Sequence, residues 1–284
     1  MRFDIYAIIK SIGVSDFSKI LWGLLLRDPI IIIGSNKHNI DLLSSFLSNL
    51  LSFRKEIVFW KSFTSREELY SILDFELQEP NEPRIIIRSP AEVSSIALTT
   101  FDNFSGWIIG ILENSISELK MPQNSIIIRL EDSIPKLVSK RNRNIYFEKI
   151  ITKIVEKTKV SVEHVRRHLE KEIHRISKDV FEEVLSLDSE FKMIIHDLFD
   201  EAMQDFYHAS RRAYFLLMKI KILRSLNVDI QIGKRNFIEL IGISESALEY
   251  ILLFIQSEWN EEFRNCVRDS VLSNIGIYVE SLWG

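Results

Sequence analysis

The segment PIIIIGSNKHNIDLLSSFLSNLL, from Pro29 to Leu51, decides the fold class of this chain. Its four consecutive isoleucines, Ile30 to Ile33, form a β-branched run without polar alternation, which is typical of a strand buried on both faces. Gly34 to Asn36 then turn the chain, and Asp41 to Leu51 places apolar side chains at helical spacing. This strand–turn–helix pattern predicts a βα unit of a mostly parallel sheet.

The same alternation continues through the first half of the chain. Further strands are expected at Ile57 to Trp60, Ile85 to Ile87, Trp107 to Leu112 and Ile126 to Leu130. Helices are expected at Ser18 to Leu26, at Arg66 to Leu73, and from Pro90 to Phe101, where the proline stands near the first turn. Strands that alternate with helices predict a mostly parallel sheet with helices on its faces.

The pattern changes near Ser133. A short basic segment with Lys136, Lys140, Arg141 and Arg143 has no apolar period, so we expect a linker there. Beyond it, apolar residues recur at helical spacing and strand signals disappear; helices are expected over Phe147 to Val155, from Ser161 to Val180, over Phe191 to Leu226 and Lys234 to Leu240, and from Ser244 onward. The sequence therefore predicts an α/β domain over residues 1–135 and an all-helical domain over residues 145–284.

Composition restricts the classes of function. The chain has 284 residues, 46% of them hydrophobic, and only 9 glycines and 6 prolines, which favours packed cores over disorder. Its net charge of −4 disfavours a dedicated nucleic-acid binder, because such proteins usually carry a basic excess. The single cysteine, Cys266, allows no disulfide within the chain and indicates a reducing compartment. With no signal pattern and no apolar run long enough to span a bilayer, we expect a cytoplasmic protein without a membrane span.

Sequence motifs for nucleotide binding are absent. The turn after the first strand, Gly34 to Asn39, contains one glycine and no Gly-Lys-Ser/Thr, whereas a P-loop needs a glycine-rich bend followed by those residues. A Rossmann fingerprint needs three glycines and also fails. We therefore expect no nucleotide cofactor and an ordinary βα turn.

Catalytic and metal-binding patterns are equally weak. His164, His168 and Glu172 stand at i, i+4 and i+8 on one helix face, but no cysteine or acidic cluster accompanies them, so we expect no metal. There is no Gly-x-Ser-x-Gly elbow, and no base is evident near Cys266. The chain is therefore predicted not to be an enzyme.

Two segments resemble helix-turn-helix units, Phe237 to Ile251 and Ile154 to Leu169. The would-be recognition helix of the first carries Glu245 and Glu249, which would repel phosphates. The second contains the basic residues Arg166, Arg167, Lys171 and Arg175. Their charge is offset by Glu163, Glu170 and Glu172. Nucleic acid is accordingly not the expected partner, although a DNA-binding protein with a degenerate nucleotide-binding-like domain stays open as the alternative function.

The order of elements resembles a DENN module, in particular the C-terminal half of folliculin-type proteins. The segment LWGLLL, Leu21 to Leu26, followed by PIIIIG, Pro29 to Gly34, resembles the apolar helix and the strand with which DENN modules begin. The next helix and the two later strands are similar to Asp41 to Leu51, to GWIIG at Gly106 to Gly110, and to Ile126 to Ile128. The family's last helices resemble FIELIGISE, Phe237 to Glu245, which leads into Leu252, Phe254 and Trp259.

This resemblance implies regulation of a small GTPase, as an exchange factor or as a scaffold of a GTPase-regulatory complex. It also implies a longin-type partner subunit, since the quoted segments contain no longin-like domain and no GTPase-activating arginine of the kind found there. Exchange needs no catalytic side chain, only a surface that prefers the nucleotide-free state. A purely structural subunit remains a third possibility.

The candidate partner-binding residues lie where buried strands are expected to end. They are Ser35, Asn36, Lys37 and His38 after the first strand, and Arg88 and Ser89 after the third. In open α/β sheets ligands gather beyond the carboxyl ends of the strands, and polar loop residues there are free to serve binding. We expect the partner, a small GTPase or another folded protein, to contact this group.

Overall fold

The computed structural model describes residues 3–62, 65, 67–68, 70–71, 82–100, 105–118, 121, 125–139, 142–172 and 187–268. Contacts divide the chain into two compact units. The first comprises Met1–Glu76 and Arg84–Met203, and the second comprises Leu77–Pro83 and Gln204–Gly284. Each unit is described by itself.

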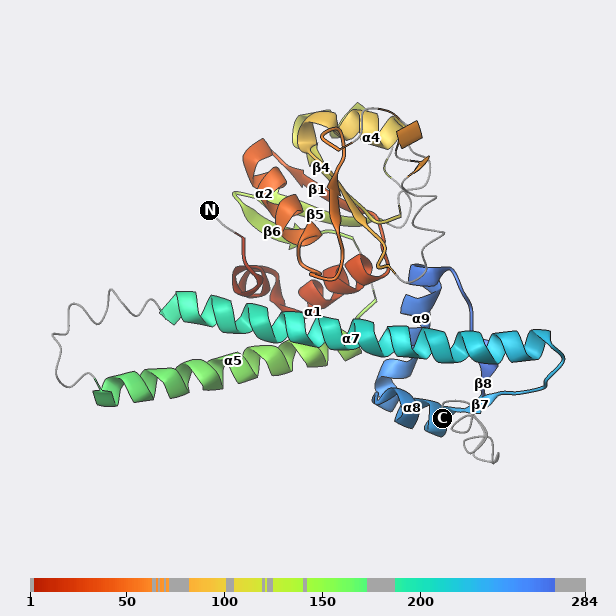
Figure 1. The fold of residues 1–284 in the computed structure, drawn as a ribbon. Coiled ribbons are helices and arrows are strands. Elements are labelled where there is room, and N and C mark those ends of the chain that lie inside the picture. The colour runs from red at the N-terminus through yellow and green to blue at the C-terminus, as the bar shows by residue number, and fades with distance from the viewer. Residues whose placement is uncertain are drawn as a thin grey trace. The chain divides into compact units, whose positions relative to one another are not determined.

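The first unit is built on a six-stranded sheet (Figure 1). Its strands are β1 (Ile30–Gly34), β2 (Glu56–Val58), β3 (Ile86–Ser89), β4 (Trp107–Leu112), β5 (Ile126–Glu131) and β6 (Ile134–Leu137). Their order across the sheet is β2-β3-β4-β1-β5-β6; the first five are parallel and β6 pairs antiparallel with β5. The predicted mostly parallel sheet is confirmed, and the carboxyl ends of five strands share one edge.

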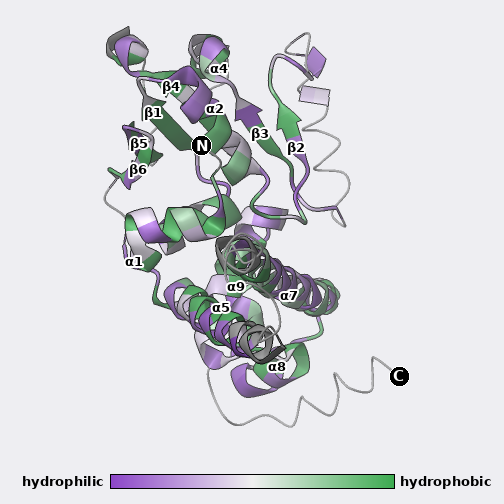
Figure 2. Ribbon diagram, turned by 90° about the vertical axis from the view of Figure 1, so that its left-hand side faces the viewer, coloured by the Kyte–Doolittle hydropathy of each residue, from purple (hydrophilic) through white to green (hydrophobic). Residues whose placement is uncertain are grey.

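Strand β1 lies between β4 and β5 because its isoleucines are buried on both faces, as the sequence predicts. Figure 2 shows it in the green of apolar residues. On one face Ile31 and Ile33 pack with Trp107 and with Ala97 of α4 (Ser94–Thr100), which follows the short 3₁₀ helix η1 (Ala91–Val93). The opposite face is covered by α2 (Lys37–Ser48), so helices flank the sheet on both sides.

Gly110 in β4 permits the close approach of α2. A Cβ atom at this position would lie 2.6 Å from Cγ2 of Ile40 on α2 and 3.3 Å from the backbone N of Ala91. The first distance is shorter than a carbon–carbon contact, so a side chain here would push α2 away from the sheet.

Helix α1 (Ile5–Leu25) precedes the sheet and contains one break. The carboxylate of Asp4 caps its start by accepting a hydrogen bond from the N–H of Ala7 at 2.7 Å. Gly13 interrupts the helix at φ 82°, a left-handed conformation that glycine adopts without steric penalty. Helix α1 lies against β6 and α5.

Two long helices follow, α5 (Ile145–Glu172) and α7 (Leu187–Ser225). Both alternate green and purple in Figure 2, as amphipathic helices do. Within the first unit they pack on α1 through three aromatic pairs: Trp22 with Phe147, Tyr6 with Phe191, and Phe17 with Phe199. Helix α7 continues into the second unit, where its residues from Gln204 onward belong.

The second unit contains, besides the end of α7, helices α8 (Lys234–Ile241) and α9 (Leu248–Trp259), the 3₁₀ helices η3 (Glu245–Ala247) and η4 (Arg264–Cys266), and a parallel pair of two-residue strands, β7 (Ile232–Gly233) and β8 (Val267–Arg268). Its core is aromatic. Tyr214 of α7 stacks on Trp259 with ring centroids 4.6 Å apart, and Phe206 packs edge-on against Phe254 at 5.3 Å. The predicted C-terminal helical region is thus confirmed.

Some predicted details are wrong. The expected linker begins with strand β6, which includes Lys136, and α5 runs unbroken past Ser161, where a new helix was expected. Of the predicted helix over Arg66 to Leu73, the structure describes Glu67, Glu68, Tyr70 and Ser71, which are helical, and the other four residues lie outside the described ranges. Phe101, the predicted end of the next helix, lies outside them too. The division into domains at 1–135 and 145–284 stays a prediction.

In the described ranges, no helix combines the length and the apolar character needed to cross a membrane.

Candidate functional site

The carboxyl ends of the parallel strands carry the residues that we group as the carboxyl-edge surface. It consists of Ser35, Asn36, Lys37 and His38 after β1, Trp60 after β2, and Glu92 after β3, all of them exposed. The structure therefore brings the four predicted residues of the first loop to the sheet edge where ligands of α/β proteins gather. Glu92 and Trp60 are additions that the sequence analysis did not include.

The turn between β1 and α2 is short and its polar groups have structural roles. The side chain of Asn36 is the N-cap of α2 and accepts a hydrogen bond from the N–H of Asn39 at 3.2 Å. Ser35 and His38 are exposed, and neither makes a hydrogen bond or ion pair to another residue in the described part of the chain. The side chains of Ser35 and His38 are therefore available for a partner, whereas that of Asn36 is engaged as the N-cap of α2.

Lys37 is paired with Glu92 across the edge. Its ammonium group donates to Oε1 of Glu92, which joins the loop after β1 to the 3₁₀ helix after β3. The hydrogen bond to Glu92 raises the pKa of Lys37 above its ordinary value. Both side chains remain substantially exposed, so the pair adds little stability but neutralises the only lysine of this turn.

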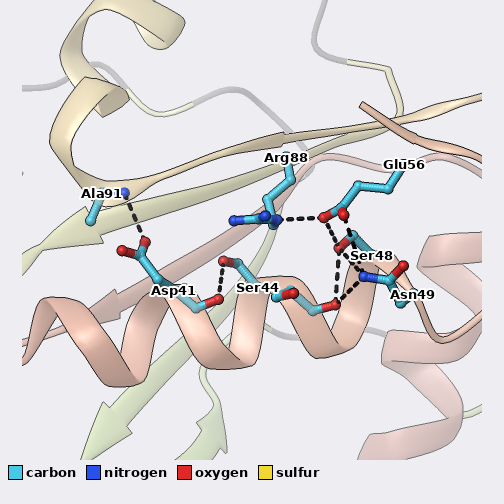
Figure 3. A network of polar contacts seen from close by, with 8 residues as sticks. Asp41, Ser44, Ser48, Asn49, Glu56, Arg88 and Ala91 are labelled. Atoms are coloured by element: carbon cyan, nitrogen blue, oxygen red, sulfur yellow. Dashed lines mark hydrogen bonds and ion pairs between the residues drawn. The ribbon is translucent and has the colours of Figure 1, made fainter. Parts of the chain in front are cut away.

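Arg88 and Ser89 lie inside β3 and not after it, which corrects the predicted position of both residues. The side chains of a strand alternate between its two faces. Arg88 therefore points toward α2, while Ser89 is fully buried. Arg88 donates from Nε to Oε1 of Glu56 on β2 (Figure 3). Because Ser89 has no exposed surface, it cannot contact a partner directly.

Glu56 lies at the centre of this polar network (Figure 3). It also accepts hydrogen bonds from Ser48 and Asn49 at the end of α2. Burial by itself would raise the pKa of Glu56, but the hydrogen bonds from Ser48 and Arg88, the charge of Arg88 and the bond from Asn49 hold it below the ordinary value. The network therefore fastens α2 to β2 and β3.

A second link holds the other end of α2. Oδ1 of Asp41 accepts a hydrogen bond from the N–H of Ala91 at 3.2 Å, at the start of η1 (Figure 3). Pro90, the N-cap residue of η1, supplies no side-chain hydrogen bond, so Asp41 takes that role from another element. On the side of β5, Nδ2 of Asn39 donates to Oγ of Ser133 at 2.6 Å. The loops of this edge are therefore fixed to one another.

Trp60 is the most unusual residue of the carboxyl-edge surface. It follows β2 at φ 74°, a left-handed conformation that is rare for a bulky residue, and 54% of its surface is exposed. The turn is closed by the N–H of Ser62, which donates to the carbonyl of Val58 at 2.9 Å, while the neighbouring Phe59 is buried. A strained backbone that presents a large aromatic side chain to solvent is a signal of function.

Across the described ranges, no three His, Cys, Asp or Glu side chains gather in a way that could hold a metal ion. The side chains of His168 and Glu172 lie outside what the structure describes, so the arrangement of His164, His168 and Glu172 is not tested. Cys266 is a buried free cysteine.

The two helix-turn-helix candidates differ in outcome. The segment from Ile154 to Leu169 is a continuous part of α5 and contains no turn. From Phe237 to Ile251 the structure does show a helix, a left-handed turn at Gly242 and a second helix, α9. However, α9 contains no lysine or arginine, and its exposed positions are Glu249 and Gln256. This helix offers no cation to DNA phosphates.

No family model, no curated protein and no solved structure matches this chain. Function is therefore inferred from the geometry of the site and from the DENN-like pattern of the sequence.

Proposed function

We propose that the chain is a non-catalytic protein-binding module of the cytoplasm, and that its partner docks on the carboxyl-edge surface. From the DENN resemblance we infer that this partner is a small GTPase, which the chain regulates as an exchange factor or as a scaffold of a GTPase-regulatory complex.

The observation that carries the proposal is the exposure of Trp60 in a left-handed turn at the end of β2. Tryptophan is enriched among the residues that dominate binding energy at protein interfaces. A conformation of this kind costs on the order of 1–3 kcal/mol, and such strain is commonly found at functional sites. An exposed, strained tryptophan beside fixed polar loops therefore supports a protein-docking role for this surface.

The polar residues of the same surface support a protein ligand over a nucleotide. A polyphosphate site needs a nest of free backbone N–H groups and a free cation. Here Asn36 occupies an N–H at the start of α2, and Glu92 neutralises Lys37. Ser35 and His38, in contrast, are free to form hydrogen bonds with a folded partner.

The test is equilibrium binding of the purified chain to a panel of small GTPases in nucleotide-free, GDP-loaded and GTP-loaded forms. The proposal predicts that at least one GTPase binds, with affinities that differ between nucleotide states, because a regulator acts only through such a difference. Duplex DNA is the control ligand. If no GTPase binds in any form while DNA binds with a steep salt dependence, the proposal is wrong and the DNA-binding alternative replaces it.

A further inference from the structure

A second polar surface lies in the second unit, on α7. A hollow of about 410 Å³ is lined, among the described residues, by Asp205, His208, Arg211, Arg212 and Phe215. These positions follow at i, i+3, i+6, i+7 and i+10, so they occupy one face over three turns of the helix. None of them belongs to the carboxyl-edge surface of the first unit.

Both arginines are held in position by the protein. Nη2 of Arg212 donates to the carbonyl of Ile241, the last residue of α8, at 3.0 Å. This carbonyl has no partner within its own helix, so a basic side chain is a favourable partner for it. The guanidinium of Arg211 lies over the ring of Phe215, 5.7 Å from the ring centroid. A stacked guanidinium keeps its N–H edge available for a ligand.

Three polar side chains of the hollow make no hydrogen bond within the described residues, although the ring of His208 lies 6.0 Å from that of Tyr207. Asp205 and His208 make no hydrogen bond or ion pair with any residue that the structure describes, and Arg211 makes only its ring contact. Two arginines and one aspartate leave the hollow positive. On a chain of net charge −4, such a locally positive hollow selects an anionic ligand.

Apolar side chains extend the hollow along the same helix. Phe215 is 38% exposed, Ile222, seven residues later, is 53% exposed, and Leu226 directly after the helix is 68% exposed. We call Arg211, Arg212, Phe215 and Ile222, together with His208, the α7 surface. A ligand that covers it must place negative charge beside apolar groups.

We propose that the α7 surface binds an acidic and apolar segment of a partner protein. Carboxylates of the segment pair with Arg211 and Arg212, whose planar forks match carboxylate geometry. Leucine-like or aromatic side chains of the segment cover Phe215 and Ile222. A phosphate group would leave those apolar side chains uncovered, and Asp205 repels its double negative charge more strongly than the single charge of a carboxylate.

Selection from a phage-displayed library of random peptides on the full chain tests this proposal. The expected peptides carry Asp or Glu next to Leu, Ile or Phe, and bind Arg211→Glu and Arg211→Gln at least about tenfold more weakly than the unaltered chain. Arg235→Glu, on the exposed side of α8, is the matched control and is expected to leave the affinity unchanged. Circular dichroism spectra establish that each variant is folded.

Three outcomes would overturn the proposal: no peptide is recovered, the peptides lack acidic residues, or they bind both Arg211 variants as well as the unaltered chain. Sodium pyrophosphate is titrated in parallel. Binding of pyrophosphate that is lost in Arg211→Gln, without any selected peptide, would make the hollow a phosphate site instead.

Discussion

Asp41 on α2 caps a different helix, η1: its Oδ1 atom accepts a hydrogen bond from the N–H of Ala91, the first residue of η1, at 3.2 Å. We predict that Asp41→Ala lowers the free energy of unfolding by about 1 kcal/mol, the usual effect of losing a helix cap. Chemical denaturation measures this change. Glu201→Ala, an exposed carboxylate on α7, is the control and should stay within about 0.5 kcal/mol of the unaltered chain. Equal stability of the two variants would contradict the capping role.

The ion pair between Arg88 and Glu56 predicts a pH dependence of stability. The folded-state pKa of Glu56 is below its ordinary value, so its contribution to stability is present above the pKa of the unfolded state and is lost as the pH falls through the folded-state pKa. Ser48→Ala removes one hydrogen bond to Glu56 and should raise its folded-state pKa. Denaturation curves between neutral and acidic pH are expected to show less loss of stability on acidification in this variant. An unchanged pH profile would exclude the role of Ser48.

Removing one partner of this pair should be more harmful than removing both. Arg88→Met leaves the largely buried carboxylate of Glu56 without its cation, and we expect a loss of about 3 kcal/mol in unfolding free energy. The double variant Arg88→Met with Glu56→Gln should recover part of that loss, because no uncompensated charge remains. A double variant less stable than Arg88→Met would show that the pair has another role.

Gly110 predicts a steric effect. Gly110→Ala places a Cβ atom 2.6 Å from Cγ2 of Ile40, so the variant should lose about 1–3 kcal/mol of stability. In an Ile40→Ala background, that contact is gone and the same substitution should be less harmful. A double-mutant cycle by chemical denaturation measures the difference. Additive effects would mean that α2 does not limit the space at Gly110.

The carboxyl-edge surface predicts weak or no binding of free nucleotides. With one glycine in the turn and Lys37 held by Glu92, we expect no micromolar affinity for ATP or GTP in isothermal titration calorimetry. Micromolar affinity that is lost in Ser35→Ala and Lys37→Ala would contradict this expectation and reassign the edge to a nucleotide.

Local patterns predicted the interior of the sheet better than its margins. Four isoleucines in a row can be satisfied only between two neighbouring strands, so Ile30 to Ile33 identified the buried strand without tertiary information. Strand β6 was missed because it is an edge strand: Ile134 is half exposed and Pro135 interrupts the usual strand composition. Ser161 was interpreted as a helix start, but it lies within the amphipathic α5.

The positions of the candidate site residues were predicted only where the end of the preceding strand was clear from the sequence. Loop residues after β1 could be placed at the edge because that strand was well defined by its sequence. Arg88 required the correct end of β3, and its contact with Glu56 joins residues that are distant in sequence. The left-handed conformation of Trp60 comes from the tertiary fold, because bulky residues adopt it rarely and no local pattern signals it.

The central claim is tested most directly by the affinity of the Trp60→Ala variant for the small GTPase that binds the unaltered chain in the binding panel. Met193→Ala is the matched control, because Met193 on α7 is a large apolar side chain that is 63% exposed but lies outside the carboxyl-edge surface. The account predicts that Trp60→Ala weakens binding at least about tenfold, about 1.4 kcal/mol, and that Met193→Ala leaves it unchanged. If Trp60→Ala binds as tightly as the unaltered chain, or if no GTPase binds at all, the proposed docking on this surface is wrong.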